Sequence, residues 1–419
     1  MKRGNGKPWR RGLVAVGLVH ALGSCTVEQP WTEPVVLEEE AAEVDAVARE
    51  EAESALVEAT HALSCEDILP EGLGPSRTVI LRANGPEAFC GPGVGNGSGV
   101  LALRNDGPFG VVAWSLVSPE GIPFGRSLIG GQFGSTLLPH RRGFHLLIDG
   151  FQPSLRLQAY SSEGEFLRQT PLVPATIEAV DVAVNPQGGT VAAWWSVVGS
   201  DSQTRNLLVQ SFDERGRPRA SPRVVQTVNG SESLDVLVGV DLRGRILVLW
   251  HRSGTGAWTG QWLRQDGTAR TQPFPALEDS DPSPSSPDDR LQPLVGEGLV
   301  LRLAGQWLRQ FPSNTPTSLP APGWLAAHPG TELALIRNNH AYALVPPATD
   351  VEESGCREQV NLFTRDGEPC GELVFPFGGS VCSRRQLGIG LDGTVIQQID
   401  LNIPANDQCA WRWWPRLLR

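Results

Sequence analysis

Lysine is almost absent from this 419-residue sequence, and its two copies, Lys2 and Lys7, both precede the first apolar run. Downstream of them no lysine is left for Schiff-base chemistry, for a phosphate-binding loop or for a general base. Tyrosine, with 2 copies, and methionine, with 1, are also scarce. In contrast, the 47 Gly and 34 Pro residues exceed ordinary usage, and helix interiors tolerate neither residue. A helix bundle is therefore excluded.

Motifs of common enzymes and metal sites are missing too. The chain has no G-x-S-x-G, H-E-x-x-H, S-x-x-K or P-loop sequence, and no C-x-x-C pair. The glycines of residues 91–99 alternate strictly, which favours a flexible loop over a dinucleotide site. His140 and His145 belong to a predicted turn and are expected to be solvated. We therefore predict no cofactor and no metal.

The N-terminus has the pattern of an export signal. Five Lys and Arg residues precede an apolar run over residues 12–22, which is too short to span a bilayer as a stable helix. The run ends in Leu22-Gly23-Ser24-Cys25, which resembles the bacterial lipoprotein box. The resemblance implies cleavage after residue 24, lipidation of Cys25 and a location in the bacterial cell envelope, on the periplasmic or outer surface. The alternative is an ordinary secretory signal.

The number of cysteines agrees with lipidation. Seven cysteines leave six to pair if Cys25 carries lipid, which suits an oxidising compartment. None lies between residues 91 and 355, so we expect the disulfides at the two ends of the folded region. Sequence alone does not choose among the 15 possible pairings. The six candidates are Cys65, Cys90, Cys356, Cys370, Cys382 and Cys409.

Negative charge is concentrated behind the signal. Residues 28–58 hold eleven acidic residues and one arginine, whereas the chain as a whole carries −11 with five positive charges in the signal. We therefore interpret residues 25–64 as an acidic tether, either helical or disordered. The remaining body, residues 65–419, carries a net charge of only −6 and has no basic stripe in its sequence, which argues against nucleic acid as a partner.

The body consists of short apolar segments that end in Asn, Asp and Gly turns. The segments 185–195 and 241–250 both read as Asn or Asp, two residues, Gly and then a β run that ends in Trp. Weaker copies bring the predicted turns to seven. The other five are residues 105–107, 140–143, 296–298, 328–330 and 391–393.

A second series of turns is out of phase with the first. Its glycines are Gly121, Gly164, Gly216, Gly267 and Gly367, and a copy near residues 312–315 lacks Gly. The mean spacing is about 49 residues, which gives two hairpins and four strands in each repeat. This predicts an all-β fold, a single β-propeller of about seven four-stranded blades.

Two further features support a closed ring. The last repeat lacks an outer strand, and residues 77–82 before the first repeat form an unassigned strand that can complete it. We expect at least one disulfide at this seam and tryptophans between the blades. The competing fold is a pair of β-sandwich domains, joined near residues 277–290. The tryptophans are Trp114, Trp194, Trp195, Trp250, Trp258, Trp262 and Trp307.

From residue 75 on, the chain resembles exported bacterial propeller lipoproteins with degenerate repeats. That resemblance concerns architecture and does not transfer function. One hypothesis is a binding or scaffold lipoprotein with an envelope protein or a glycan as its partner. The other is a hydrolase or lyase of envelope or extracellular glycans, in which acidic side chains from several blades converge at the central channel of the propeller. The first acids to test are Asp181, Asp235 and Glu332, each on or beside a predicted inner strand.

Overall fold

The structure is a computed structural model, and the chain divides into two units, Met1–Glu58 and Ala59–Arg419. The predicted signal peptide, Cys25 and most of the predicted tether lie outside the described residues. No helix among the described residues is long and apolar enough to cross a membrane. Those residues are 62–82, 90–106, 111–130, 135–148, 155–173, 177–198, 203–230, 233–252, 257–278, 289–296, 298–313, 315–347, 349–351, 355–378, 387–399 and 408–419.

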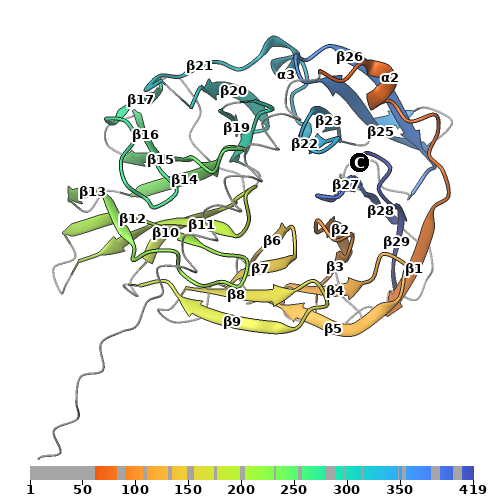
Figure 1. The fold of residues 1–419 in the computed structure, drawn as a ribbon, viewed down its shortest axis with the longest axis horizontal. Coiled ribbons are helices and arrows are strands. Elements are labelled where there is room, and N and C mark those ends of the chain that lie inside the picture. The colour runs from red at the N-terminus through yellow and green to blue at the C-terminus, as the bar shows by residue number, and fades with distance from the viewer. Residues whose placement is uncertain are drawn as a thin grey trace, which may run out of the picture. The chain divides into compact units, whose positions relative to one another are not determined.

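The second unit is a propeller of seven antiparallel sheets, as predicted (Figure 1). In blades 1 to 4 four consecutive strands follow one another from the inner to the outer edge. Blade 1 is β2 (Cys90–Gly95), β3 (Leu101–Asn105), β4 (Ala113–Val117) and β5 (Pro123–Ile129); blade 2 is β6 (Thr136–His140), β7 (Gly143–Ile148), β8 (Arg156–Ser161) and β9 (Phe166–Pro171). Blade 3 is β10 (Ile177–Val184), β11 (Thr190–Val197), β12 (Thr204–Phe212) and β13 (Arg223–Asn229); blade 4 is β14 (Leu234–Val240), β15 (Ile246–Arg252), β16 (Trp258–Leu263) and β17 (Phe274–Leu277).

Blades 5 to 7 continue the ring with local variations. Blade 5 is β18 (Arg290–Pro293), β19 (Leu299–Leu303), β20 (Gln306–Phe311) and β21 (Leu319–Pro320), followed by the short helix α3 (Gly323–Ala326). Blade 6 is β22 (Glu332–Ile336), β23 (Ala341–Val345), β25 (Gly355–Thr364) and β26 (Pro369–Phe375), with the extra strand β24 (Thr349–Val351) paired to β25. Blade 7 is β27 (Leu387–Ile389), β28 (Val395–Ile399), β29 (Gln408–Trp414) and β1 (Arg77–Arg82).

The ring closes through strands from both ends of the body. β1 pairs antiparallel with β29 from Arg77 opposite Trp413 to Arg82 opposite Gln408. In Figure 1 the orange β1 therefore lies beside the dark blue β29. The predicted completion of the last blade by residues 77–82 is confirmed, and it leaves blade 7 with four strands.

Hydrophobic side chains form one cluster between each pair of neighbouring blades. The cluster between blades 3 and 4 joins Trp195 of β11 to Trp250 of β15, and the cluster between blades 7 and 1 joins Trp411 of β29 to Leu103 of β3. Each blade thus buries both faces against its neighbours, which stabilises a ring that has no terminal blade. All seven tryptophans predicted to pack between blades are buried.

The turn between the first and second strand repeats a specific hydrogen bond. The side chains of Asn96, Asn185 and Asp241 each accept the backbone N–H two residues ahead, all at 3.0 Å. In blade 2 the Nδ1 atom of His140 accepts the equivalent N–H, that of Arg142, at 3.3 Å. In blade 2 an imidazole therefore occupies the position that Asn or Asp occupies in blades 1, 3 and 4.

The turn between the third and fourth strand has a similar design. Ser118, Ser161, Asp213 and Thr364 each place a side-chain oxygen against a backbone N–H further along the turn. Gly216 in one of these turns has φ +71°, a conformation that L side chains rarely adopt. These are the turns that the second series of glycines predicts.

Two predictions about the first series of turns were wrong, and so was the prediction of a flexible loop over residues 91–99. Asn105 is the last residue of β3, the second strand of blade 1, and residues 328–330 precede blade 6, so neither position is an inner hairpin; residue 107 lies outside the described residues. The inner hairpins of those blades lie after β2 and after β22. Residues 90–95 form the inner strand β2, because this strand packs closely on blade 7: a Cβ on Gly95 would lie 3.1 Å from Gly390 Cα.

Two disulfides connect the ends of the body. Cys90 of β2, the inner strand of blade 1, is bonded to Cys409 of β29, which confirms the expected disulfide at the seam. Cys65 is bonded to Cys370 of β26 and fastens the short helix α2 (Cys65–Ile68) to blade 6. Cys382 and the side chain of Cys356 lie outside the described part of the chain.

Candidate functional site

Exposed arginines gather on the face of the ring that carries both kinds of hairpin turn, which we call the turn face. In the turns of blades 2 to 4, residues 140–143, 161–165, 185–189, 213–219, 241–245 and 264–270, eight arginines are exposed against three exposed acids. We call these eight the arginine surface: Arg141, Arg142, Arg215, Arg217, Arg219, Arg243, Arg264 and Arg270.

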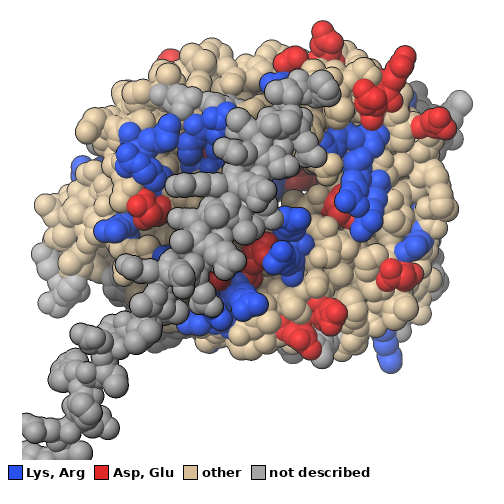
Figure 2. Space-filling view, viewed as in Figure 1, with Lys and Arg blue, Asp and Glu red and all other residues tan. Residues whose placement is uncertain are grey.

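Arginine accounts for all of the basic side chains in the described part of the chain, since both lysines lie outside it. In Figure 2 many of the arginines on the visible face lie toward the inner part of the ring, with acidic side chains between them, and others lie at the rim. Guanidinium groups present several donors in a fixed plane, which suits recognition of carboxylates. The arginine surface thus has a net positive charge, with a few acidic side chains between the arginines.

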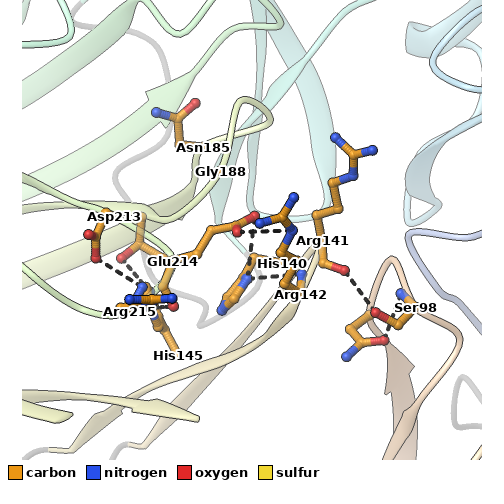
Figure 3. A network of polar contacts seen from close by, with 12 residues as sticks. Ser98, His140, Arg141, Arg142, His145, Asn185, Gly188, Asp213, Glu214 and Arg215 are labelled. Carbon is orange, nitrogen blue, oxygen red and sulfur yellow. Dashed lines mark hydrogen bonds and ion pairs between the residues drawn. The ribbon is translucent and has the colours of Figure 1, made fainter. Parts of the chain in front are cut away.

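At the blade 2 end of this surface, a network of polar contacts joins blades 1, 2 and 3 (Figure 3). Ser98 of blade 1 donates to the carbonyl oxygen of Arg141 at 3.1 Å, and the N–H of Gly97 donates to the carbonyl oxygen of His140 at 3.2 Å. On the other side, Nε of Arg142 lies 3.8 Å from a carboxylate oxygen of Glu214 in blade 3. The blade 2 turn is therefore fixed between its two neighbours.

His140 and His145 lie beneath this turn, and the expectation that they are solvated was wrong. Their side chains are buried, with ring centroids 4.7 Å apart. Burial lowers the pKa of His140 to about 3, with a further contribution from His145, and burial lowers the pKa of His145 to about 4. Both rings are thus neutral near pH 7.

Hydrogen bonds agree with the neutral rings. Nδ1 of His140 accepts from the N–H of Arg142, so it needs its lone pair, and its 4.0 Å approach to Glu214 is not an ion pair. Nε2 of His145 faces the carbonyl oxygen of Glu214 at 3.2 Å and must donate, so Nδ1 accepts from the Thr190 hydroxyl at 3.0 Å. The histidines position Arg142 and Glu214 from below.

Asp181 lies on the inner strand of blade 3 and links it to blade 4. One carboxyl oxygen accepts from the N–H of Val182 at 2.8 Å, and the other accepts from the N–H of Val238 in β14 at 2.7 Å. Burial of the carboxyl group raises the pKa of Asp181 to about 7, although both hydrogen bonds and the charge of Arg290 oppose the rise. The group can therefore exchange a proton near neutral pH.

The other two acids that the sequence singled out also have partners within the fold. Asp235 on β14 places a carboxyl oxygen 3.4 Å from Nδ1 of His251 on β15. Glu332 on β22 forms an ion pair with Arg290 on β18 of the preceding blade. Arg290 thus interacts with two of the three acids, Asp181 and Glu332. Asp235 has a different partner, His251.

No group of three or more His, Cys, Asp or Glu side chains suited to a metal ion occurs among the described residues. The arginine surface was missed by the sequence analysis because its members come from separate turns of three blades. The Arg-rich turns 140–143, 213–219 and 264–270 were visible in the sequence, and the shared phase of the repeats would have placed them on one face.

Comparison with known proteins gives only fold-level likenesses. No family model and no curated protein matches the chain. An oligogalacturonate lyase in complex with manganese has a TM-score of 0.41 and 13% identity over 81% of this chain and 96% of its own. A catalytically inactive virginiamycin B lyase from Staphylococcus aureus with quinupristin has a TM-score of 0.41 and 10% identity over 81% and 99%. Identities this low transfer no function.

Proposed function

We propose that this protein is a lipid-anchored binding protein of the bacterial cell envelope, and that its arginine surface binds an acidic surface of another envelope protein. The observation that carries the proposal is the gathering of eight exposed arginines in the turns of three adjacent blades. Their hairpins are held by side-chain caps and by contacts between blades, so the surface needs little ordering when it binds.

The mixed signs of the surface favour a protein over a uniform polyanion. Glu163, Glu165 and Asp266 are exposed among the arginines, and Glu214 approaches Arg142. A surface with both signs selects partners by repulsion as well as attraction and fixes their register. A glycan or a nucleic acid with evenly spaced negative charge would meet these acids as well.

Crosslinking in cells tests the proposal. A photo-crosslinking amino acid at Gln187, an exposed turn residue within the surface, is expected to give a discrete protein adduct in full-length protein. Charge reversal by Arg142→Glu with Arg215→Glu is expected to abolish it, because opposite charges across the contact become like charges. The matched control is Arg416→Glu with Arg419→Glu, two exposed arginines near the chain end.

The partner protein in the adduct is then identified, and its acidic residues at the contact are replaced by arginine in the charge-reversed background. Restoration of the adduct when acids of the identified partner are changed to arginine would support the proposal. An adduct that survives the Arg142 and Arg215 reversals, a nucleic acid or glycan adduct, or no adduct at Gln187 would contradict it.

The anchor has a separate test. Cys25→Ser is expected to abolish incorporation of a radiolabelled fatty acid and to move the protein from the membrane fraction to the soluble fraction. Cys65→Ser, which removes a cysteine of the body, is the control and is expected to leave labelling unchanged. Labelling that persists in Cys25→Ser would contradict the lipid anchor.

A second candidate function rests on Asp181. A carboxyl group with a pKa of about 7 beside Arg290 suits general acid or base catalysis, which agrees with a glycan hydrolase or lyase. Asp181→Asn would then abolish release of sugar from envelope polysaccharide, while Asp235→Asn serves as the comparison. Absence of sugar release by the wild-type protein would leave binding as the function.

A further inference from the structure

A pocket of about 420 Å³ lies on the turn face where the ring closes, between blades 7 and 1; none of the eight arginines of the arginine surface lines it, although Ser98, which bonds to Arg141, does. We call it the seam pocket. Its walls come from the turns of both blades, from the end of β29 and from the start of β1. Ligand sites commonly have volumes of about 300 to 1,000 Å³, so this one suits a small molecule.

Two arginines supply the positive charge of the seam pocket. The side chain of Arg416 is 54% exposed, and its Nε lies 3.9 Å from Asp392, beyond a hydrogen bond. Arg77 donates from Nη1 to the carbonyl oxygen of Pro119. A guanidinium has five N–H donors, so both side chains retain donors for a ligand.

The acids that line the pocket are already used by the protein. Asp392 accepts from the N–H of Thr394 at 3.1 Å and from its hydroxyl at 2.9 Å, and its side chain is 4% exposed. The Ser118 hydroxyl bonds to Glu120 and lowers the pKa of that carboxyl, with Arg77 as a weaker contributor. Both carboxylates thus already accept hydrogen bonds from the protein, and the N–H groups of Arg77 and Arg416 are the charged donors that the pocket offers to a ligand.

The shape of the pocket depends on close packing at the seam. The ring of Trp413 lines it and is otherwise buried, with Pro119 and Pro415 nearby. A Cβ on Gly99 would lie 2.9 Å from Asp392 Oδ2, and Gly99 has φ +85°. Arg416 also has a positive φ, 50°, and its N–H donates to Thr394 at 3.0 Å, which fixes its backbone. The two guanidinium groups therefore flank a preformed, partly apolar cavity.

We propose that the seam pocket binds a small molecule with a carboxylate group, which Arg77 and Arg416 contact while Trp413 and the prolines contact its apolar part. Guanidinium groups pair with carboxylates through parallel hydrogen bonds, which gives orientation as well as affinity. The carboxylate can come from an acidic sugar or from the C-terminus of a short peptide. Both ligands present the same group to the two arginines.

Calorimetric titration of the full-length protein tests this proposal and separates the two sources. The probes are glucuronate and an N-acetylated dipeptide with a free C-terminal carboxylate, each compared with its neutral form, the methyl ester or the amide. At least one carboxylate is expected to bind about ten-fold or more tightly than its neutral form, since hydrogen bonds to charged groups are the stronger ones. The preferred probe identifies the source.

Two variants locate the binding. Arg416→Gln is expected to weaken the carboxylate probe about ten-fold, and Arg77→Gln is expected to do the same. Arg168→Gln, an exposed arginine on the outer strand β9 of blade 2, is the matched control and is expected to bind like wild type. Since Arg77 also holds Pro119, circular dichroism of each variant checks its fold, and Arg416→Gln decides the result if Arg77→Gln unfolds.

Three outcomes would overturn the proposal. They are equal binding of the charged and neutral probes, unchanged binding by folded Arg416→Gln, and no binding of either carboxylate at millimolar concentration. The proposal does not depend on the arginine surface, because reversal of Arg142 and Arg215 is expected to leave this titration unchanged.

Discussion

The inner turn of blade 4, residues 241–245, and that of blade 7, residues 390–394, share Leu and Gly at their second and fourth positions, but their aspartates stand at the first and third positions and hold the turns in different ways. Asp241 in blade 4 is fully buried, and it accepts from Arg245 Nε at 2.7 Å and from the Ser313 hydroxyl of blade 5 at 2.5 Å. In blade 7 the Asp392 carboxylate accepts from the N–H and the hydroxyl of Thr394, and it lies 3.9 Å from Nε of Arg416. Blade 7, however, is also joined to blade 1 by the disulfide between Cys409 and Cys90.

The difference follows from where the chain is continuous. Blades 4 and 5 are consecutive in sequence, and a buried polar network between their turns stabilises their contact. Blades 7 and 1 meet at strands that are far apart in sequence, and a covalent bond with a sequence separation of 319 residues holds them. A closed ring therefore uses local side-chain contacts where it can and crosslinks where its two ends meet.

The largest expected effect comes from removal of Asp241. Asp241→Ala leaves the Arg245 guanidinium buried without its carboxylate, which costs about 3 to 5 kcal/mol of unfolding free energy when a buried pair is broken. Urea denaturation measures it. Asp392→Ala is the matched control, with a smaller expected loss. Equal losses in the two variants would contradict the comparison.

The seam disulfide is expected to have the next largest effect. Cys90→Ser with Cys409→Ser frees the joint between blades 7 and 1 and is expected to lower the unfolding free energy by about 2 to 4 kcal/mol. The comparison is Cys65→Ser with Cys370→Ser, which frees only α2 from the outer strand of blade 6. Thermal denaturation without reductant should rank the first pair below the second; the reverse order would show that the seam does not limit stability.

The smallest expected effect is a dependence of stability on pH. It comes from buried titratable side chains of blades 2 and 3, whereas the disulfide at the seam does not titrate. The pKa values of His140 and His145 fall from 6.5 to about 3 and about 4 on folding, so the unfolded chain binds more protons and stability decreases as the pH falls below 6.5. The pKa of Asp181 rises from 3.8 to about 7, so its contribution decreases as the pH rises from 4 to 7. Two histidines outweigh one aspartate.

Stability is thus expected to increase from pH 4 to pH 6.5 in urea denaturation at a series of pH values. His140→Gln, in which the amide oxygen can still accept from Arg142, should flatten this increase, whereas Asp181→Asn should steepen it. A slope that neither substitution changes would show that other groups cause the pH dependence.

The repeat could be predicted from sequence where its chemistry is uniform. The Asn or Asp of the turns at residues 185–189 and 241–245, followed by glycine, indicates the hairpin directly, and those predictions were confirmed. His140 was misjudged because an imidazole does there what a carboxamide or carboxylate does in other blades. The strand of residues 90–95 was missed because its glycines serve close packing rather than a bend.

The candidate sites were less predictable than the fold. Asp181, Asp235 and Glu332 were correctly expected on inner strands, but their partners come from other strands and neighbouring blades. The seam pocket joins residues near position 77 with residues near position 416, and only the closed ring brings them together. Such distant neighbours follow from ring geometry and not from local sequence.

The pairing of β1 with β29 also sets an order of assembly. During synthesis β1 is made before all the other strands of the body, and its partner β29 is made after them. Blade 7 therefore stays incomplete, and the faces of blades 1 and 6 that it covers stay exposed, until the last strand has been delivered. Arrival of the C-terminal strand is thus the step that converts an open row of blades into a ring.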